Sequence, residues 1–510
     1  MPASNTLARM YPVLALDQGT SGTKALVVCP ERGVLASAYE PLRPRYGPGP
    51  AVEVDPAQLF DSVVSAGRRA VAEAREPISA VGLANQGETV LAWDRVTGLP
   101  TGDAVVWQDR RSAELCADLV AADPGLPARL EQLTGLALDP YFAAPKLAWL
   151  RRRVTHGVVT TSDTWLVHRL CGAFVTDAST ASRTLLLDLD ATTWSAAALT
   201  AFGLDGEVLP TVVDSAGQVG VTRVFDDALP AGAAHGLPVT GLIVDQQAAL
   251  LAQRCLSAGE AKCTFGTGAF LLATTGPTAV RSTRSLAACV AWRLAGRATY
   301  CLDGQVFTVG SAVRWASDLG LLAGPEELDA VASAVPDAGG VRFVPAFAGL
   351  AAPWWRPQAR AQLSGLGLHT GRGHIARALC EGIAADVVEL ADAVADDLGA
   401  PLSVLRVDGG LTRSRVLMQT QADLLQRPVE CYPLPDATAL GVAALARLGA
   451  RGALALADAV QPWHPVAVYE PRIGPDQAAG TRAAHRRAVA AVLAQEDPPR
   501  GTGPEAKETR

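Results

Sequence analysis

Two short turns rich in glycine and threonine are the part of this sequence best suited to binding phosphate. The stretch DQGTSGTK, Asp17 to Lys24, follows an apolar run and supplies an acid, two glycines, hydroxyl groups and one of only four lysines among 44 basic residues. FGTGAF, Phe265 to Phe270, is a second such turn. Backbone N–H groups of these turns bind phosphate, and an ammonium group is a familiar phosphate ligand. Each turn alone is equally compatible with an ordinary hairpin, whereas a facing pair predicts two phosphate contacts across a cleft.

Three further stretches carry candidate residues, and each also has a plainer interpretation. LIVDQQAAL ends an apolar run on Asp245, whose carboxylate could bind a metal, accept a proton or only cap the helix predicted after it. VDGGLTRS, Val407 to Ser414, allows a flat ligand to approach the backbone, or is only a tight turn. GLANQGETVLAW, Gly82 to Trp93, places a polar stretch between two apolar runs. Its Gln-Gly-Glu is either an ordinary turn or, as we interpret it, part of a substrate pocket.

The runs around these turns predict two α/β halves. YPVLALD, KALVVC and VLASAYEPL are expected to form three hairpin strands, followed by a helix with Asp55 as N-cap and Pro56 as its first residue. Strand, Gly/Thr turn and strand recur from Glu260, so the halves are predicted to be remote copies. We place an N-terminal domain at 11–252, a C-terminal domain at 253–480 and a C-terminal extension at 481–510, whose last part has the composition of a disordered tail.

Composition narrows the class of protein. The chain is 49% apolar and 19% charged, with a net charge of −7 and no Lys/Arg-rich run, which argues against a nucleic-acid partner. Its nine cysteines are scattered and include no Cys-x-x-Cys pair, which favours free thiols in a reducing cytoplasm and gives no zinc site. No run reaches the roughly 18 to 20 apolar residues of a membrane span. We therefore expect a soluble, cytoplasmic protein with no membrane partner.

Taken in order, the motifs of the chain resemble those of the FGGY carbohydrate kinases, and most closely the glycerol kinase branch. The similarity runs from about Leu14 to about Gly449 and rests on ALDQGTSGTKA, NQGETVLAWDRVTGLP, AVVWQDRRSAE, DPYFAAPKLAWL, DTWLVHRL, DASTASRTLL, VDQQAAL, FGTGAF, VPAFAGLAAPWW, LRVDGG and TALGVAALA. It implies two actin-like (ribonuclease H-like) domains that close on ATP and magnesium, with a small polyol or sugar in the cleft. Homodimers and homotetramers are both common in the family, and the sequence does not choose between them.

The resemblance also implies roles for individual residues. Asp245 would be the general base, and magnesium would bind Asp17 and Asp245. The ATP phosphates would be contacted from one side by Thr20, Ser21, Gly22 and Lys24, and from the other by Gly266, Thr267 and Gly268. The nucleoside would lie against Gly310, Arg314, Gly409, Gly410 and Ser414. The polyol would be bound by Glu88, Trp107, Tyr141, Asp245, Gln246 and Phe270, beside Gly87.

The sequence departs from the family at Gly87, where glycerol kinases carry an arginine that would bind two hydroxyl groups. Its absence removes a forked hydrogen-bond donor and is expected to leave a cavity, which a larger polyol or a sugar could use. Val244 is a second departure, because the family usually has glycine before the catalytic aspartate.

The resulting expectation is ATP-dependent phosphorylation of a terminal hydroxyl of glycerol or a related polyol. A kinase for a larger polyol or a ketopentose, of the erythritol or xylulose type, is the alternative within the family, because TSGTKAL and APKLAWL resemble the xylulose kinase branch. An actin-like nucleotide-driven assembly protein is the alternative from another class. Such a protein would keep both phosphate turns but would have no use for Glu88, Trp107 and Tyr141.

Overall fold

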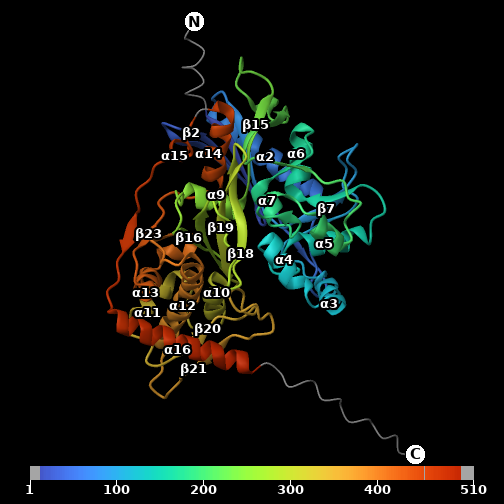
Figure 1. Cartoon of the computed structure of the whole chain (residues 1–510). Helices are drawn as coiled ribbons and strands as arrows, with labels where there is room; N and C mark the ends of the chain where they lie inside the picture. Colours follow the sequence, from blue (N-terminus) through green and yellow to red (C-terminus); the bar gives the residue numbers. More distant parts are fainter. Residues whose placement is uncertain (1–11, 453, 496–510) are drawn as a thin grey trace, which may run out of the picture.

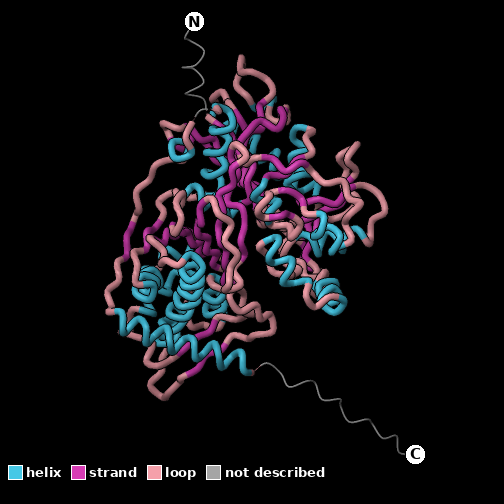
Figure 2. Tube along the Cα trace, in the orientation of Figure 1, coloured by secondary structure: helices cyan, strands magenta, loops and turns pink. Residues whose placement is uncertain are grey.

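The computed structural model describes residues 12–452 and 454–495, which form two large mixed β-sheets with helices packed against them (Figures 1 and 2). The six-stranded sheet has the order β14 (Ala216–Thr222), β15 (Leu237–Val244), β6 (Ala80–Asn85), β1 (Val13–Gly19), β2 (Gly22–Cys29) and β3 (Gly33–Pro41). The seven-stranded sheet has the order β18 (Ala287–Leu294), β19 (Arg297–Val306), β17 (Ala269–Gly276), β16 (Glu260–Phe265), β22 (Val404–Asp408), β23 (Val429–Cys431) and β24 (Ala467–Tyr469).

Both sheets are built around the same core arrangement. In the first, β1 pairs antiparallel with β2 and β2 with β3, while β6 and then β15 follow in parallel on the other side of β1. In the second, β16 pairs antiparallel with β17 and β17 with β19, while β22 and β23 follow in parallel. This repeated order confirms the predicted α/β architecture of two similar halves, each opening with a hairpin.

A smaller five-stranded sheet joins the first half, and it explains the position of the Gln-Gly-Glu turn. Its order is β4 (Arg45–Tyr46), β5 (Val52–Val54), β8 (Ala104–Val105), β7 (Val90–Trp93) and β9 (Val158–Thr161). Residues 86–89 connect β6 of the six-stranded sheet directly to β7 of this smaller sheet. The turn therefore lies between two sheets, with Gly87 and Glu88 both buried.

The principal helices follow the predicted signals. The helix α2 (Pro56–Ala74) begins as expected, since the Asp55 side chain accepts a hydrogen bond of 2.8 Å from the backbone N–H of Ala57 and proline occupies the first turn. The other helices of at least eight residues are α3 (Ala113–Ala122), α4 (Leu126–Thr134), α5 (Ala143–Arg151), α6 (Ser162–Cys171), α9 (Asp245–Ala252), α10 (Gly310–Asp318), α12 (Arg372–Leu398), α13 (Arg415–Leu425), α14 (Ala437–Arg451) and α16 (Pro475–Ala494).

Short elements complete the two halves. The short helices are α7 (Ala178–Ser182), α8 (Ala196–Phe202), η1 (Asp226–Ala228), η2 (Pro325–Glu327), α11 (Leu328–Ala332), η3 (Gly410–Arg413) and α15 (Leu456–Ala459). The remaining strands form three two-stranded sheets from β10 (Val175–Asp177) with β13 (Thr211–Val213), β11 (Leu187–Asp188) with β12 (Thr193–Trp194), and β20 (Arg342–Val344) with β21 (Gln362–Ser364).

One helix crosses from the second half of the sequence to the first sheet. The helix α14 packs on β15, β1 and β6 and against α9, beside the blue and green strands at the top of Figure 1. Its contact with the sheet includes a hydrogen bond of 2.8 Å from the Thr240 hydroxyl to the carbonyl oxygen of Ala446. The two halves are therefore interleaved in space, and the boundary between residues 252 and 253 stays a prediction.

The chain ends, as far as the structure describes it, in the long helix α16 along the base of the second half (Figure 2). This helix contacts β20, α12 and α13. The predicted extension from residue 481 thus begins inside a helix, while the tail predicted to be disordered, 496–510, lies outside the described residues.

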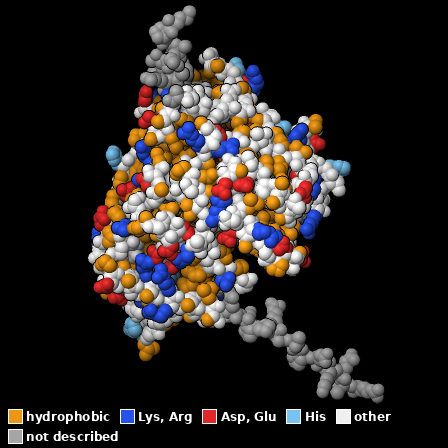
Figure 3. All heavy atoms as spheres, viewed as in Figure 1, with side chains coloured by type: hydrophobic (Ala, Val, Ile, Leu, Met, Phe, Trp, Pro, Cys, Tyr) orange, Lys and Arg blue, Asp and Glu red, His pale blue; other side chains and the backbone are white. Residues whose placement is uncertain are grey.

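The molecular surface is mixed in character. Acidic and basic side chains are interspersed on the face drawn in Figure 3. Within residues 12–452 and 454–495, no helix is both long enough and apolar enough to cross a membrane.

The contact between α14 and α9 gives a prediction for stability. A Cβ atom on Gly441 would overlap the carbonyl oxygen of Ala248, whereas a Cβ on Gly480, in the exposed part of α16, meets no atom within 4 Å. We expect Gly441→Ala to lower the free energy of unfolding by about 1–3 kcal/mol through overpacking. Gly480→Ala, the matched control, should raise it by up to about 1 kcal/mol through helix propensity. Denaturant unfolding of both variants measures the difference, and equal values would contradict the close packing of α14.

Candidate active site

Two of the predicted acids lie at the same edge of the six-stranded sheet. In the parallel strands, Asp17 of β1 and Ile243 of β15 are both in register with Ala84 of the intervening β6, and Asp245 follows as the first residue of α9. The strands that carry or precede the two acids are two strand spacings, roughly 10 Å, apart, and Asp245 lies two residues beyond the register of Asp17. Both carboxylates can therefore face a single bound group at the carboxyl ends of the strands.

The electrostatics at this edge favour added positive charge. Burial raises the pKa of Asp17 to about 8, helped by the negative charges of Asp245 and Asp436. Burial and the charge of Glu88 raise the pKa of Asp245 to about 7. Excess negative charge of this kind fits a divalent cation. Within the described residues, no group of three or more His, Cys, Asp or Glu side chains could hold a metal ion by itself.

The side chains of the first Gly/Thr turn are largely held by neighbouring residues. The Thr20 hydroxyl donates to Oε1 of Gln86 at 3.4 Å and accepts a hydrogen bond of 2.8 Å from the indole Nε1 of Trp107. The ammonium group of Lys24 lies 3.3 Å from Oδ2 of Asp436, a residue that the sequence analysis did not single out. Ser21 is exposed, so its hydroxyl is open to a ligand.

Close packing requires glycine at one position in the first turn and at one position next to the second turn. A Cβ atom on Gly22 would lie 2.5 Å from the Tyr39 hydroxyl oxygen, because β3 packs tightly there. A Cβ on Gly310, at the start of α10, would lie 2.5 Å from the carbonyl oxygen of Gly266. This close approach lets the N–H of Gly310 bond to that carbonyl at 3.0 Å, and the N–H of Val309 bond to the carbonyl of Thr267 at 2.9 Å. The second turn, Gly266 to Gly268, is therefore fixed by the N-terminus of α10.

Two adjoining cavities lie along the segment that follows β22, residues 409–414. One, of about 590 Å³, is lined by residues that include Gln246, Gly409, Gly410 and Asp436. The other, of about 340 Å³, shares Gly410 and also touches Ser414. They bring together several of the residues predicted to contact the nucleotide.

The hydroxyl of Ser414, although Ser414 lines the smaller cavity, is already hydrogen-bonded within the protein. The Ser414 hydroxyl donates to Oδ1 of Asp329 at 2.5 Å and accepts from the N–H of Leu417, so it caps α13. Arg314 is exposed on α10 and lines neither cavity.

Two of the aromatic residues predicted to bind the polyol, Trp107 and Tyr141, pack against each other. The rings of Trp107 and Tyr141 meet edge to face, with centroids 5.8 Å apart. The loop that carries Tyr141 is held by Lys146, whose buried ammonium group donates to the carbonyls of residues 140, 141 and 142. Burial lowers the pKa of Lys146 to about 8. Three carbonyl acceptors around one ammonium group fix the path of the loop and with it the position of the Tyr141 ring.

Gln246 and Phe270 are connected through the buried Lys262. Nζ of Lys262 donates to Oε1 of Gln246 at 2.5 Å and to the hydroxyl of Thr264 at 3.0 Å. Thr264 is directly opposite Phe270 in the β16–β17 hairpin. The carbonyl oxygen of the Gln246 amide is therefore held from the second half of the chain.

An arginine that the sequence analysis missed links the two halves. Arg183 follows α7 and is 4% exposed. Its Nε donates to Oε1 of Glu88 at 2.6 Å, and its Nη1 donates to Oδ2 of Asp303, on β19 of the second half, also at 2.6 Å. Nη2 lies 3.4 Å from the Tyr141 hydroxyl. The only feature of the sequence that could have drawn attention to Arg183 is that it is the one charged residue in the run ASTASRTLL.

The structure corrects one expectation about Gly87. A Cβ atom on this residue would lie 2.8 Å from Cγ2 of Val244 and 3.7 Å from Cγ of Arg183. The space directly beside Gly87 is therefore filled, and the expected cavity is absent there, because the second departure from the family, Val244, occupies it.

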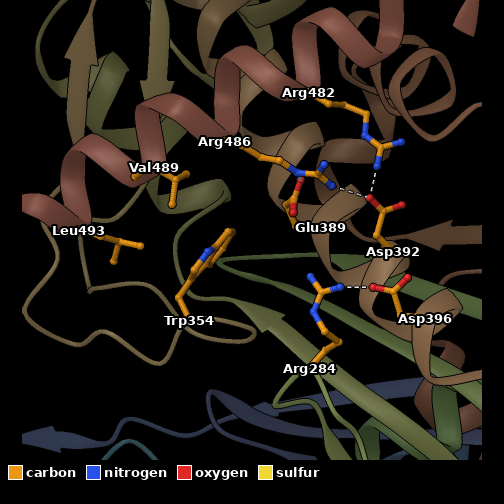
Figure 4. Close-up of a pocket in the computed structure, with 10 residues that line it drawn as sticks. Arg284, Trp354, Glu389, Asp392, Asp396, Arg482, Arg486, Val489 and Leu493 are labelled. Carbon is orange, nitrogen blue, oxygen red and sulfur yellow. Dashed lines mark hydrogen bonds and ion pairs between the residues drawn. The ribbon is translucent and has the colours of Figure 1, made fainter.

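The cavity of about 620 Å³ in Figure 4 lies away from this site, between α16, α12 and the segments that carry Arg284 and Trp354. Its arginines point toward carboxylates: Arg486 lies 2.6 Å from Glu389, Arg482 pairs with Asp392, and Arg284 pairs with Asp396. The charges on its wall are neutralised by one another, so it offers no counterpart to the strand-end site.

Comparison with known proteins gives consistent results along the chain. Residues 12–252 match the N-terminal domain of the FGGY family of carbohydrate kinases, and residues 261–450 match its C-terminal domain. A glycerol kinase of Alkalilimnicola ehrlichii is 44% identical over 94% of this chain and 98% of its own length. A glycerol kinase of Thermus brockianus is 43% identical with the same coverage.

Solved structures of similar proteins have the same fold. Plasmodium falciparum glycerol kinase with ADP superimposes with a TM-score of 0.88 at 32% identity, covering 95% of this chain and 98% of that one. A xylulose kinase from Brucella ovis superimposes with a TM-score of 0.84 at 26% identity, covering 96% and 100%. With both domain models matched and relatives above 40% identity over nearly the full length, the chain belongs to the FGGY family of carbohydrate kinases.

Proposed function

We propose that this kinase transfers the γ-phosphoryl group of ATP to a terminal hydroxyl group of glycerol. The observation that carries the proposal is the pair of strand-end acids, Asp17 and Asp245, at one edge of the first sheet, next to Glu88. Kinase chemistry requires in-line positioning of the reactants, a metal to spread charge and a carboxylate to accept the hydroxyl proton. Relatives named glycerol kinase at 43–44% identity support glycerol as the alcohol.

Asp245 is proposed as the general base. Its carboxylate is partly exposed, and desolvation together with the charge of Glu88 raises its pKa to about 7, which makes it a stronger base than a free aspartate. One oxygen accepts a hydrogen bond of 2.6 Å from the N–H of Gln246, which leaves the other to take the proton of the alcohol. Its place at the N-terminus of α9 keeps the carboxylate oriented.

Asp17 and Asp245 are proposed to hold magnesium, directly or through water. Bound magnesium would neutralise charge on the phosphate oxygens. The protein supplies a rigid binding position for the ion, because Asp17 is fixed in the β1–β2 hairpin. Lys24, which pairs with Asp436, is directly opposite Asp17 in that hairpin.

The nucleotide is proposed to lie across the two adjoining cavities. Gly266, Thr267 and Gly268 would contact its phosphates from one side, and the turn of Thr20, Ser21, Gly22 and Lys24 from the other. Gly409 and Gly410 would let the flat base approach the backbone. A solved relative that contains ADP supports a nucleotide in this fold.

For the alcohol, Glu88 and Gln246 are proposed to bind hydroxyl groups, while Trp107, Tyr141 and Phe270 cover the C–H edge. Arg183 is proposed as a positioning residue for this wall, because its guanidinium group holds Glu88 and lies next to the Tyr141 hydroxyl. The cytoplasmic location, expected from composition, stays a prediction. The homodimer or homotetramer, expected from the resemblance, also stays a prediction.

A substrate panel tests the proposal first. ADP release should depend on an added alcohol. Among glycerol, dihydroxyacetone, erythritol, xylitol and xylulose, the highest kcat/KM should be that for glycerol. Fastest release with xylulose or erythritol would favour the larger-substrate alternative. Release that needs no alcohol and accompanies polymerisation would favour the assembly protein.

The role of Asp245 is tested by Asp245→Asn, which keeps the shape of the side chain but removes the base. We expect nucleotide binding to persist and kcat to fall by roughly 10²–10⁴-fold. Asp163→Asn is the matched control, because Asp163 is also an acid in the first turn of a helix and accepts a hydrogen bond of 2.6 Å from Thr176. Full transfer by the Asp245 variant would show that another group accepts the proton.

The role of Arg183 is tested by Arg183→Lys, which keeps the charge but loses the planar fork. We expect kcat/KM for glycerol to fall by about 100-fold through misplacement of Glu88, with KM for ATP unchanged. Arg406→Lys is the control, because Arg406 is also held by two acids, Glu260 at 3.1 Å and Glu430 at 3.3 Å, on a strand away from the alcohol. Equal losses of kcat/KM in both variants would leave Arg183 only a structural role.

A further inference from the structure

The wall of the alcohol site beside Gly87 is closed by a side chain from another strand. Gly87 is buried, and the Cγ2 methyl group of Val244 lies 2.8 Å from the point where a Cβ atom on residue 87 would be. Real Cβ atoms essentially never approach another carbon below 3.0 Å. A side chain at position 87 and the present side chain at position 244 therefore exclude each other.

The backbone leaves Val244 little freedom to move away. It is the last residue of β15, directly in register with Asn85 at the end of the parallel strand β6. Its N–H bonds to the Ser179 hydroxyl at 3.0 Å, and its side chain is 2% exposed. A β-branched side chain also has few rotamers to choose from. The methyl group is thus fixed between the general base, which is the next residue in the chain, and the turn that carries Glu88.

We infer that Val244 is the residue that limits substrate size in this kinase, and that Gly87 and Val244 act as one complementary pair. The inference rests on the proposed glycerol kinase function and adds the residue that excludes longer polyols. An apolar methyl group here provides no hydrogen-bond donor, and it takes the position that the first atom of a side chain at residue 87 would need. Hydroxyl recognition is left to Glu88, the residue after Gly87, and Gln246, two residues after Val244.

Reducing the side chain at position 244 should make room for a longer substrate. We expect Val244→Ala to raise the ratio of kcat/KM for erythritol to that for glycerol by about 10-fold or more, the scale of one or two methylene groups in a pocket. The control is Val239→Ala, at a buried valine of the same strand β15, which should leave the ratio unchanged. An unchanged ratio in the Val244 variant would overturn the size limit.

A double-mutant cycle tests the pairing without relying on activity. Gly87→Ala alone should lower the melting temperature by about 5 °C, because the new Cβ collides with Val244. In the Val244→Ala background the same change should have little effect, because the methyl group is gone. In the Val239→Ala background it should remain fully destabilising. Additive losses in the Val244 background would overturn the pairing.

The two measurements separate this inference from the proposed function. If no polyol stimulates ADP release by the unchanged protein, the proposed function fails, while the melting-temperature cycle still decides whether Gly87 and Val244 exclude each other. If glycerol is phosphorylated but neither the ratio nor the cycle responds, the function stands and the specificity pair fails.

Discussion

The buried guanidinium group of Arg183 is the contact on which the geometry of the site depends. It holds Glu88 of the first half and Asp303 of the second at 2.6 Å each, with all three residues at most 6% exposed. Two buried carboxylates that lost this partner would be left uncompensated, at a cost of about 3–5 kcal/mol. The planar fork of an arginine can serve both acids at once, as the point charge of a lysine cannot. The distance between the halves is thus tied to the orientation of the acid proposed to bind the alcohol.

The lysines of the described residues complement this arrangement. Most basic residues of the chain are arginines, yet Lys24, Lys146 and Lys262 each support a part of the same site. Lys24 pairs with Asp436, Lys146 meets three carbonyl groups of one loop, and Lys262 orients Gln246. A compact ammonium group suits such converging acceptors better than a broad guanidinium group. Lys146 and Lys262 thus each hold converging oxygens, whereas Arg183 bridges two separated acids.

Local sequence signals predicted the elements well, because their causes are local. The Asp55 cap, the proline that follows it and the two Gly/Thr hairpins act within a few residues, and all are present in the structure. The partners of Arg183 lie 95 and 120 residues away, and the ASTASRTLL run has no periodicity that would reveal them. The return of α14 to the first sheet likewise depends on contacts between segments about 200 residues apart. Such features arise from packing between distant segments, which neither spacing nor propensity encodes.

Gly87 shows that predicting substrate specificity from sequence is limited in the same way, because contacts between distant segments decide it. Considered alone, a missing side chain predicts empty space and therefore a larger substrate. Whether space is in fact empty depends on the register of β15 against β6, which places Val244 opposite Asn85 and brings its methyl group to the position of the missing Cβ. A departure at one position of a pocket can thus be offset by a second that is distant in sequence and adjacent in the sheet. The volume of the pocket is a property of the pair, so neither residue alone predicts which alcohol fits.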